Sequence, residues 1–320
     1  MPPDRITRGY IQSWNMIYER KLPSDFVVSI GYVGTQTTNQ LADFNMNWSP
    51  AGGGNTGRQL YPKSTTSIMY WDGWLSKNYH SLQTTINRRF TGGLFVKGAY
   101  TWGRAIDMAN DEGWAGISWN DPALIHRNRA MANYDRKHNL QLATVYQLPW
   151  GRDGEGIGNW LVRDWQVNGI FSITSNSPFT IGASSGTLNA RNNAQTAQQV
   201  GAWDIIGGIG RDQKYFTTSA FAPVEEVRPE CTSANPCYGN TGRNIMRGPS
   251  WTNLDLSLFR TFQVSEDFGV EFRSEFFNIT NTPKFGNPNG NASSSAFGEV
   301  RGTASFAPSR VIRFALKLKF

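Results

Sequence analysis

Histidines are the first residues to test for catalysis, because imidazole is the commonest general base in enzymes. The titratable and nucleophilic candidates around them are His80, His126, His138, Asp121, Asp135, Ser81 and Ser118. No G-x-S-x-G elbow is present, and no spacing fixes a Ser-His-Asp triad. The sequence therefore predicts no enzyme and assigns these side chains to loops and strand ends.

Three acidic residues lie close together in one polar segment. Asp107, Asp111 and Glu112 are oxygen ligands of the kind that a hard cation such as calcium prefers. They lack the Asp-x-Asp-x-Asp-Gly order of an EF-hand loop. We therefore expect these carboxylates to be solvated in a loop, and we expect neither a metal nor another cofactor.

The two cysteines, Cys231 and Cys237, share a segment rich in Pro, Asn and Ser. With no second pair and no nearby histidine, a zinc site is disfavoured. A small loop disulfide in an oxidising compartment is the preferred interpretation, and two free thiols are the alternative.

Composition narrows the class of protein. The chain of 320 residues has 33 Gly, 12 Trp, 11 Tyr and 19 Phe with only 17% charged residues, which is typical of many strands and turns. Its net charge is +7, but the cations are spread singly, so nucleic-acid binding is not expected. No run approaches the roughly 18 apolar residues of a spanning helix. The lack of such a run does not exclude a membrane β-barrel, because only half of the residues in each of its strands are apolar.

The elements that position these residues are strands. In the last segment, 310–320, Ile312, Phe314, Leu316 and Leu318 share one parity, and this period of two is that of a β-strand. The same alternation predicts strands at 10–18, 26–32, 78–90, 94–102, 140–148, 165–174, 254–258 and 270–276.

Charged residues alternate with these apolar residues near the carboxy terminus. A charge on the lipid side of a membrane strand is costly, so such residues are expected to face a wet lumen. The lumen-facing candidates are Glu271, Arg273, Glu275, Arg313 and Lys317. Glu271, Arg273 and Glu275 could line a solute path or contact a plug. The preferred interpretation is that they pair with cations such as Lys317 on a neighbouring strand.

The connections between these strands alternate in length. Short turns are expected at 21–25, 90–93, 149–159 and 263–267, and long polar loops at 35–73, 104–133, 182–249 and 281–305. A bacterial outer-membrane barrel has short periplasmic turns and long extracellular loops. The predicted fold is all-β, an antiparallel up-and-down transmembrane β-barrel. About nine strands would form only part of a larger barrel, because such barrels have an even number.

Several segments carry a family resemblance. Asn139-Leu-Gln-Leu-Ala-Thr-Val-Tyr-Gln-Leu-Pro149, Asn253-Leu-Asp-Leu-Ser-Leu-Phe-Arg-Thr-Phe262 and Phe272-Arg-Ser-Glu-Phe-Phe-Asn-Ile-Thr-Asn-Thr-Pro-Lys-Phe-Gly286 resemble the carboxy-terminal barrel of TonB-dependent receptors. Asn78-Tyr-His-Ser-Leu-Gln-Thr-Thr-Ile-Asn-Arg-Arg-Phe90 and Tyr100-Thr-Trp-Gly-Arg-Ala105 are similar to the Oar-like group. The likeness covers nearly all of the chain.

This resemblance implies a receptor in the outer membrane of a Gram-negative-type bacterium. Its partners would be outer-membrane lipid, a ligand held by extracellular loops and a plug, and the TonB complex, which pulls on the plug. The plug and the amino-terminal carboxypeptidase-regulatory-like domain have no counterpart in residues 1–320. The chain is therefore expected to be the carboxy-terminal barrel portion alone.

The ligand stays unassigned. Loop residues Trp114, Trp119, Asp111 and Glu112 are the candidate contacts, and the aromatic, Asn, Thr and Gly content of the loops suits a glycan or a peptide. The rival interpretation is a soluble or cell-surface β-sandwich that binds carbohydrate or protein without transport. A membrane-embedded hydrolase that depends on His138 is a third.

Overall fold

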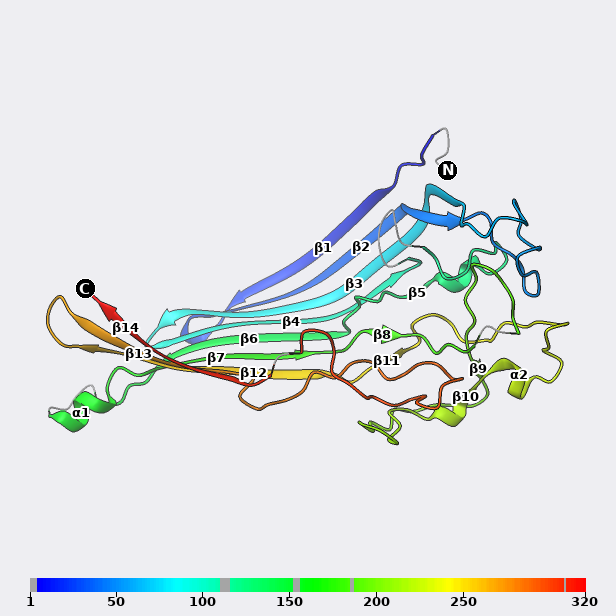
Figure 1. Cartoon of the computed structure of the whole chain (residues 1–320). Coiled ribbons are helices and arrows are strands. Elements are labelled where there is room, and N and C mark those ends of the chain that lie inside the picture. The colour runs from blue at the N-terminus through cyan, green and yellow to red at the C-terminus, as the bar shows by residue number, and fades with distance from the viewer. Residues whose placement is uncertain (1–4, 110–115, 152–155, 185–186, 308) are drawn as a thin grey trace.

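Nine antiparallel strands follow one another in a single sheet (Figure 1). The structure is a computed structural model that describes residues 5–109, 116–151, 156–184, 187–307 and 309–320. The strands, in spatial order, are β1 (Tyr10–Lys21), β2 (Phe26–Asn45), β3 (Met69–Thr91), β4 (Leu94–Asp107), β6 (His138–Gln147), β7 (Gln166–Thr174), β12 (Trp251–Gln263), β13 (Gly269–Phe277) and β14 (Val311–Lys319). β5 (Ala130–Met131) pairs with β4 beside this path.

This topology confirms the predicted fold class, an all-β, up-and-down partial barrel. Each strand pairs with its neighbour in the chain, and β1 and β14 are the two unclosed edges. Figure 1 shows the short turns at one end of the strands and the long loops at the other. Among the described residues, no second sheet covers the apolar side chains, so the β-sandwich interpretation is wrong.

The first hairpin of long strands extends further than the sequence indicated. β2 continues to Asn45 and β3 begins at Met69, so the loop spans 46–68 instead of the expected 35–73. Thr37, Gln40 and Asn45 lie in this extension and are buried despite being polar. Their register is interrupted between Thr37 and Leu41 by a bulge, which breaks the simple alternation that sequence patterns detect.

A short helix replaces part of the expected turn at 149–159. This helix, α1 (Ile157–Val162), and α2 (Val224–Val227) are the two α-helices of the described residues. Neither is long and apolar enough to cross a membrane. Short 3-10 turns lie at Pro23–Asp25, Ile125–Asn128 and Thr218–Ala220.

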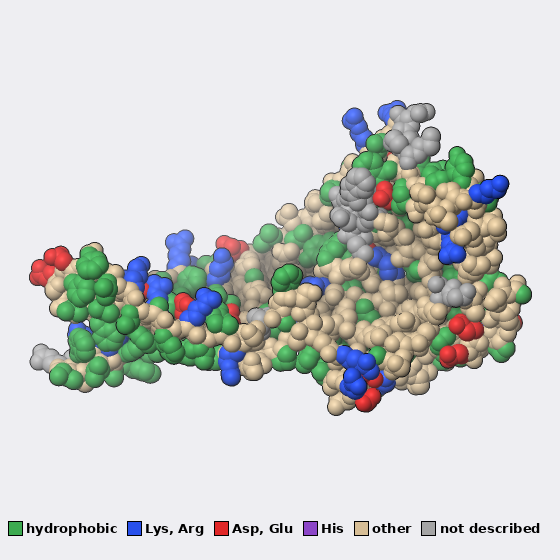
Figure 2. Space-filling model, in the orientation of Figure 1, with side chains coloured by type: hydrophobic (Ala, Val, Ile, Leu, Met, Phe, Trp, Pro, Cys, Tyr) green, Lys and Arg blue, Asp and Glu red, His purple; other side chains and the backbone are tan. Residues whose placement is uncertain are grey.

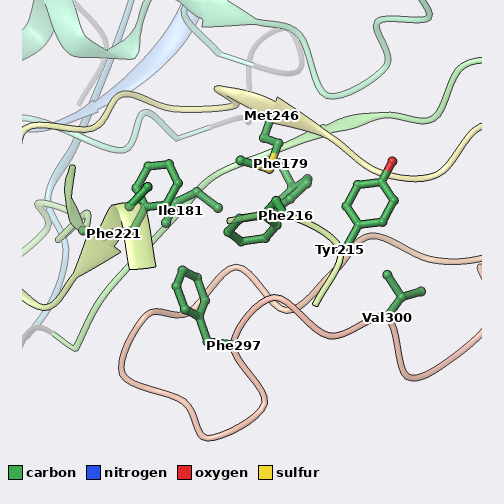
Figure 3. Close-up of a cluster of buried hydrophobic side chains, with 10 residues drawn as sticks. Phe179, Ile181, Tyr215, Phe216, Phe221, Met246, Phe297 and Val300 are labelled. Atoms are coloured by element: carbon green, nitrogen blue, oxygen red, sulfur yellow. The ribbon is translucent and has the colours of Figure 1, made fainter. Parts of the chain in front are cut away.

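The long loops fold over one another and have a hydrophobic core of their own. Two small sheets, β8 (Pro178–Phe179) with β11 (Met246–Arg247) and β9 (Gln198–Gln199) with β10 (Phe221–Ala222), organise the loop between β7 and β12. Phe216 is completely buried at the centre of this core, and its ring meets that of Phe297 edge-on, with centroids 5.3 Å apart (Figure 3). Phe297 comes from the loop between β13 and β14, so two loops share one core, which we call the loop core.

Candidate functional site

The strand register sorts side chains onto two faces of the sheet. Leu82 lies opposite Tyr32 on one neighbour and Trp102 on the other, and paired residues share a face. We call this the apolar face; it also carries Leu142, Phe171, Leu256 and Leu316. The opposite, polar face carries Ser29, Thr85, Gln141, Asn168, Ser257 and Glu271. Leu316 is 71% exposed on the apolar face, so only an apolar environment outside the protein can cover it.

The polar face satisfies its own hydrogen bonds between neighbouring strands. The hydroxyls of Ser29 and Thr85 lie 2.7 Å apart. The Ser172 hydroxyl donates to Oε1 of Gln141 at 2.6 Å. The side-chain amide of Asn168 donates to the Ser257 hydroxyl at 3.0 Å. Such a surface is compatible with water and does not need a dry core against it.

The charged candidates of the last strands gather on this polar face. Glu271 lies opposite Lys317 in the register, and Glu275 lies opposite Arg313. The ion pairs of Glu271 run instead to Arg273, its neighbour two residues along, and to Nζ of Lys319 at 2.5 Å. The structure therefore brings all five predicted residues to one face, and it makes Lys319 the main cross-strand partner. Figure 2 shows acidic and basic side chains together in this part of the molecule, above a band of hydrophobic ones.

Two arginines, the buried Arg243 and the half-buried Arg247, connect the longest loop to carboxylates outside it. Arg243 donates to the carboxylate of Asp107 at the end of β4 and, through Nε, to the carbonyl of Asn128 at 3.1 Å. Arg247 donates to the carboxylate of Asp135. The side chains of Asp107 and Asp135 are 0% and 1% exposed, so neither carboxylate is the solvated loop group that the sequence suggested for Asp107.

Asparagines tie the other loops together. Asn120 accepts from the backbone of Asn45 at 2.6 Å and donates to the carbonyl of Asn192 at 2.6 Å. Asn193 accepts from the backbone N–H groups of Asn120 and Asp121. Because these amides are already hydrogen-bonded within the protein, they hold the loops in place and leave few groups for a ligand.

Of the four predicted ligand-loop residues, the structure describes one, Trp119. Asp111, Glu112 and Trp114 lie outside the described residues. Trp119 is 1% exposed, and its indole N–H donates to the carbonyl of Ala194 at 2.9 Å. The structure thus places Trp119 in the packing between loops and not on a surface that a ligand can reach.

Cys231 and Cys237 form a disulfide within the longest loop, with Cα atoms 5.3 Å apart. The next residue, Tyr238, is half-buried, and the burial of its ring raises the pKa of Tyr238 to about 12. The Arg127 guanidinium lies over the Tyr238 ring, 5.8 Å from its centroid, and donates to the carbonyl of Gly239. This corner of the loops is therefore packed around an uncharged tyrosine.

A carboxylate of the loop core is held by two cations. Glu299 accepts from Nε of Arg301 at 2.6 Å and from Nζ of Lys214 at 3.0 Å. These hydrogen bonds, that of Arg301 first, hold the pKa of Glu299 below its usual range. Its side chain is 2% exposed, so the pair joins the two loops that share the loop core.

An apolar cleft of about 350 Å³ opens among the loops, where two of the predicted ligand loops meet. Phe44 and Trp74 pack edge-on, with ring centroids 6.0 Å apart. The other lining residues are Met46, Tyr70, Asp72, Pro122 and Ile125. We call this site the aromatic cleft.

The histidines form no catalytic triad. Nδ1 of His80 lies 2.7 Å from the Tyr32 hydroxyl, and Nδ1 of His138 lies 2.8 Å from the Tyr100 hydroxyl. Both pairs belong to the apolar face. Among the described residues, no group of three His, Cys, Asp or Glu side chains is placed to hold a metal ion.

Sequence reasoning missed three arginines. Arg243 and Arg247 stand singly in a polar loop, and nothing in their spacing reveals that they meet distant carboxylates. Arg260 does carry a signal, because it interrupts the apolar parity of β12. Its guanidinium lies 4.0 Å from the centroid of the Phe262 ring and donates to the carbonyls of Trp160 and Leu161 in α1.

Several solved structures are similar to this chain over nearly its whole length. The outer membrane transporter YddB from Escherichia coli matches with 8% identity and a TM-score of 0.48 over 98% of this chain and 32% of that chain. The ferric citrate transporter FecA matches with 10% identity and a TM-score of 0.44, over 97% and 31%. The copper transporter OprC matches with 9% identity and a TM-score of 0.42, over 99% and 32%. The chain thus spans about a third of the length of these proteins.

Curated proteins give no match to this sequence. The family comparison does: residues 1–313 match the family described as outer membrane beta barrel domain. This match agrees with the single antiparallel sheet, the exposed apolar face and the long loops at one end. The chain therefore belongs to the outer membrane beta barrel domain family, and the protein is located in the outer membrane of Gram-negative bacteria.

Proposed function

We propose that residues 1–320 are the carboxy-terminal barrel portion of a TonB-dependent receptor of the Oar-like group, a transporter and not an enzyme. The observation that carries this proposal is the separation of the two faces. The apolar face contacts lipid, and the polar face, with Glu271, Arg273, Glu275, Arg313 and Lys317, lines a wet lumen.

The two unclosed edges support a larger barrel. β1 pairs only with β2, and β14 only with β13. In hydrocarbon, every backbone N–H and C=O group needs an internal partner, so these edges require further strands. In this proposal the same receptor supplies those strands, a plug in the lumen, an amino-terminal carboxypeptidase-regulatory-like domain, and the segment that contacts the TonB complex.

The aromatic cleft is the ligand contact that we favour. The faces of sugar rings stack on aromatic side chains such as Trp74 and Phe44, which line this cleft. We therefore propose a glycan as the ligand. A peptide is the alternative, because the same apolar walls accept hydrophobic side chains.

The orientation of the faces is tested by two neighbouring substitutions. Leu316→Arg places a cation in lipid, at about 2–4 kcal/mol near the midplane, whereas Ala315→Arg places the same cation in the lumen. We expect only Leu316→Arg to lower the yield of heat-modifiable protein in outer-membrane fractions. Equal yields, or a larger loss with Ala315→Arg, would refute the assignment.

Ligand capture is tested on the protein extracted from outer membranes. Oligosaccharide and peptide arrays should identify a glycan that binds wild type, and Trp74→Ala should weaken that binding about tenfold by loss of ring stacking. Trp150→Ala removes an exposed ring at the opposite end of the strands and serves as the matched control. Equal affinity of wild type and Trp74→Ala would exclude the aromatic cleft.

Energised transport is tested in whole cells. Uptake of the bound glycan should stop when the TonB complex is deleted, while surface binding stays unchanged. Uptake that continues without TonB would show a passive pore instead of a TonB-dependent receptor.

A further inference from the structure

A groove of about 750 Å³ lies on the apolar face at the extracellular rim. Its apolar walls include Leu82, Trp102 and Met131. The register places it: Arg104 lies opposite His80, two residues beyond the Leu82–Trp102 pair, and Met131 lies opposite Ile106 on the same face. Arg104 is near the end of β4 that meets the long loops, so the groove lies near the outer surface of the membrane. We call it the rim groove.

Three cations line this groove, which is unexpected for a surface that contacts lipid. Arg104 and Lys137 are exposed, and no described carboxylate pairs with either. Arg247 is already paired, because it donates to the buried carboxylate of Asp135, to the backbone carbonyls of Asp135 and Asn176, and to Sδ of Met131 at 3.2 Å. Within the described part of the chain, two positive charges are therefore left without a counter-ion at the edge of an apolar surface.

The chemistry of the groove selects its occupant. Cations that border an apolar wall fit a molecule with an anionic head and a hydrocarbon tail. A phosphate monoester carries about −1.5 to −2 charges, which matches Arg104 plus Lys137, and a guanidinium binds phosphate oxygens through two parallel hydrogen bonds. The Tyr32–His80 hydrogen bond fixes both rings at the side of the groove, where they offer further polar atoms.

We propose that the rim groove binds the phosphate-bearing headgroup of an anionic lipid in the outer leaflet, with the acyl chains lying along Leu82 and Trp102. This inference rests on the proposed orientation of the apolar face toward lipid. It goes beyond the receptor function, because it concerns a lipid bound to the apolar face of the sheet and not a transported ligand.

Native mass spectrometry of the detergent-extracted protein tests the proposal. The probes are lipid A, which carries phosphate monoesters, phosphatidylglycerol, which carries one phosphodiester, and phosphatidylcholine, which is neutral overall. We expect affinity to fall in that order. Removing a cation near an anionic lipid surface weakens binding about fivefold, so Arg104→Ala/Lys137→Ala should bind lipid A about 25-fold more weakly.

The matched control is Lys63→Ala/Arg211→Ala, which removes two exposed loop cations away from the groove and should leave lipid binding unchanged. If the double variant Arg104→Ala/Lys137→Ala does not assemble, Arg104→Gln can replace it, because this substitution keeps the side chain polar. Arg104→Gln removes one cation and should weaken lipid A binding about fivefold. Inorganic phosphate at the same concentration should not displace the lipid.

Three results would overturn the proposal: equal lipid A affinity for the groove variants and wild type, equal binding of phosphatidylcholine and lipid A, or displacement by inorganic phosphate, which would show a free-phosphate site. These outcomes are separable from a failure of the receptor proposal. The Leu316→Arg and Ala315→Arg pair reports the orientation of the wall whether or not the groove holds lipid.

Discussion

The buried pair of Arg243 and Asp107 is predicted to be the main fastener of the longest loop. Arg243→Met keeps most of the side-chain volume but leaves the Asp107 carboxylate, which is 0% exposed, without its guanidinium. Breaking a buried ion pair by removing one partner costs about 3–5 kcal/mol, because an uncompensated charge stays buried. At about 1.4 kcal/mol per factor of ten, 4 kcal/mol makes local opening roughly a thousandfold more frequent.

Hydrogen exchange measures this opening directly. Amides of segments 124–131 and 239–247 should lose about three orders of magnitude of protection in Arg243→Met, in line with that cost. Amides of β12 and β13 should be unchanged, because these strands pair within the sheet and not with the loop.

Two further variants isolate the cause. Asp107→Asn/Arg243→Met removes both charges and should recover much of the lost protection. Arg228→Met breaks the exposed pair with Glu230 and should leave protection almost unchanged, because water screens this pair. If Asp107→Asn/Arg243→Met costs as much as Asp107→Asn alone and Arg243→Met alone added together, the two residues do not interact, and this reasoning is refuted.

Three other predictions concern separate parts of the molecule. Arg260→Ala should release α1 from β12 at a cost of about 2–4 kcal/mol and shift the tryptophan fluorescence to the red. Arg260→Lys keeps the charge but loses the planar guanidinium group. An unchanged fluorescence spectrum of Arg260→Ala would contradict the contact. Cys231→Ser should loosen segment 228–240 by about 2 kcal/mol, seen as faster hydrogen exchange there, with the rest of the loop unaffected. The folded-state pKa of Glu299 is lowered, so its stabilising effect is present above the unfolded value of about 4.3 and is lost as pH falls through the folded value. Glu299→Gln should therefore flatten the acid dependence of loop-core proteolysis, and an unaltered acid profile would count against it.

The strands could be predicted from the sequence because one physical rule governs them. Each wall residue meets either lipid or water, so side chains alternate in character, and Phe314 with Leu316 against Lys317 shows the rule plainly. This alternation no longer holds where the strands extend beyond the membrane. In the extension of β2, Gln40 and Asn45 are buried among loops, and their pairing depends on partners that the local pattern does not reveal.

The loop core and the rim groove could not be predicted from the sequence, for a different reason. Phe179, Phe216 and Phe297 stand singly among Gly, Asn and Ser residues, and they become a core only when distant segments meet. Arg104, Lys137 and Arg247 likewise gather from two connections and a strand end. The disulfide partners, in contrast, are the chain's two cysteines and lie six residues apart, so the sequence allowed one intramolecular pairing.

The shared core between two loops also couples the folding of one loop to that of the other. Phe297 and Val300 belong to the connection between β13 and β14, while the aromatic residues that they cover belong to the connection between β7 and β12. The loop core therefore forms only when both connections are in place. A chain in which the connection between β13 and β14 is displaced would expose Phe216, which is completely buried in the folded protein.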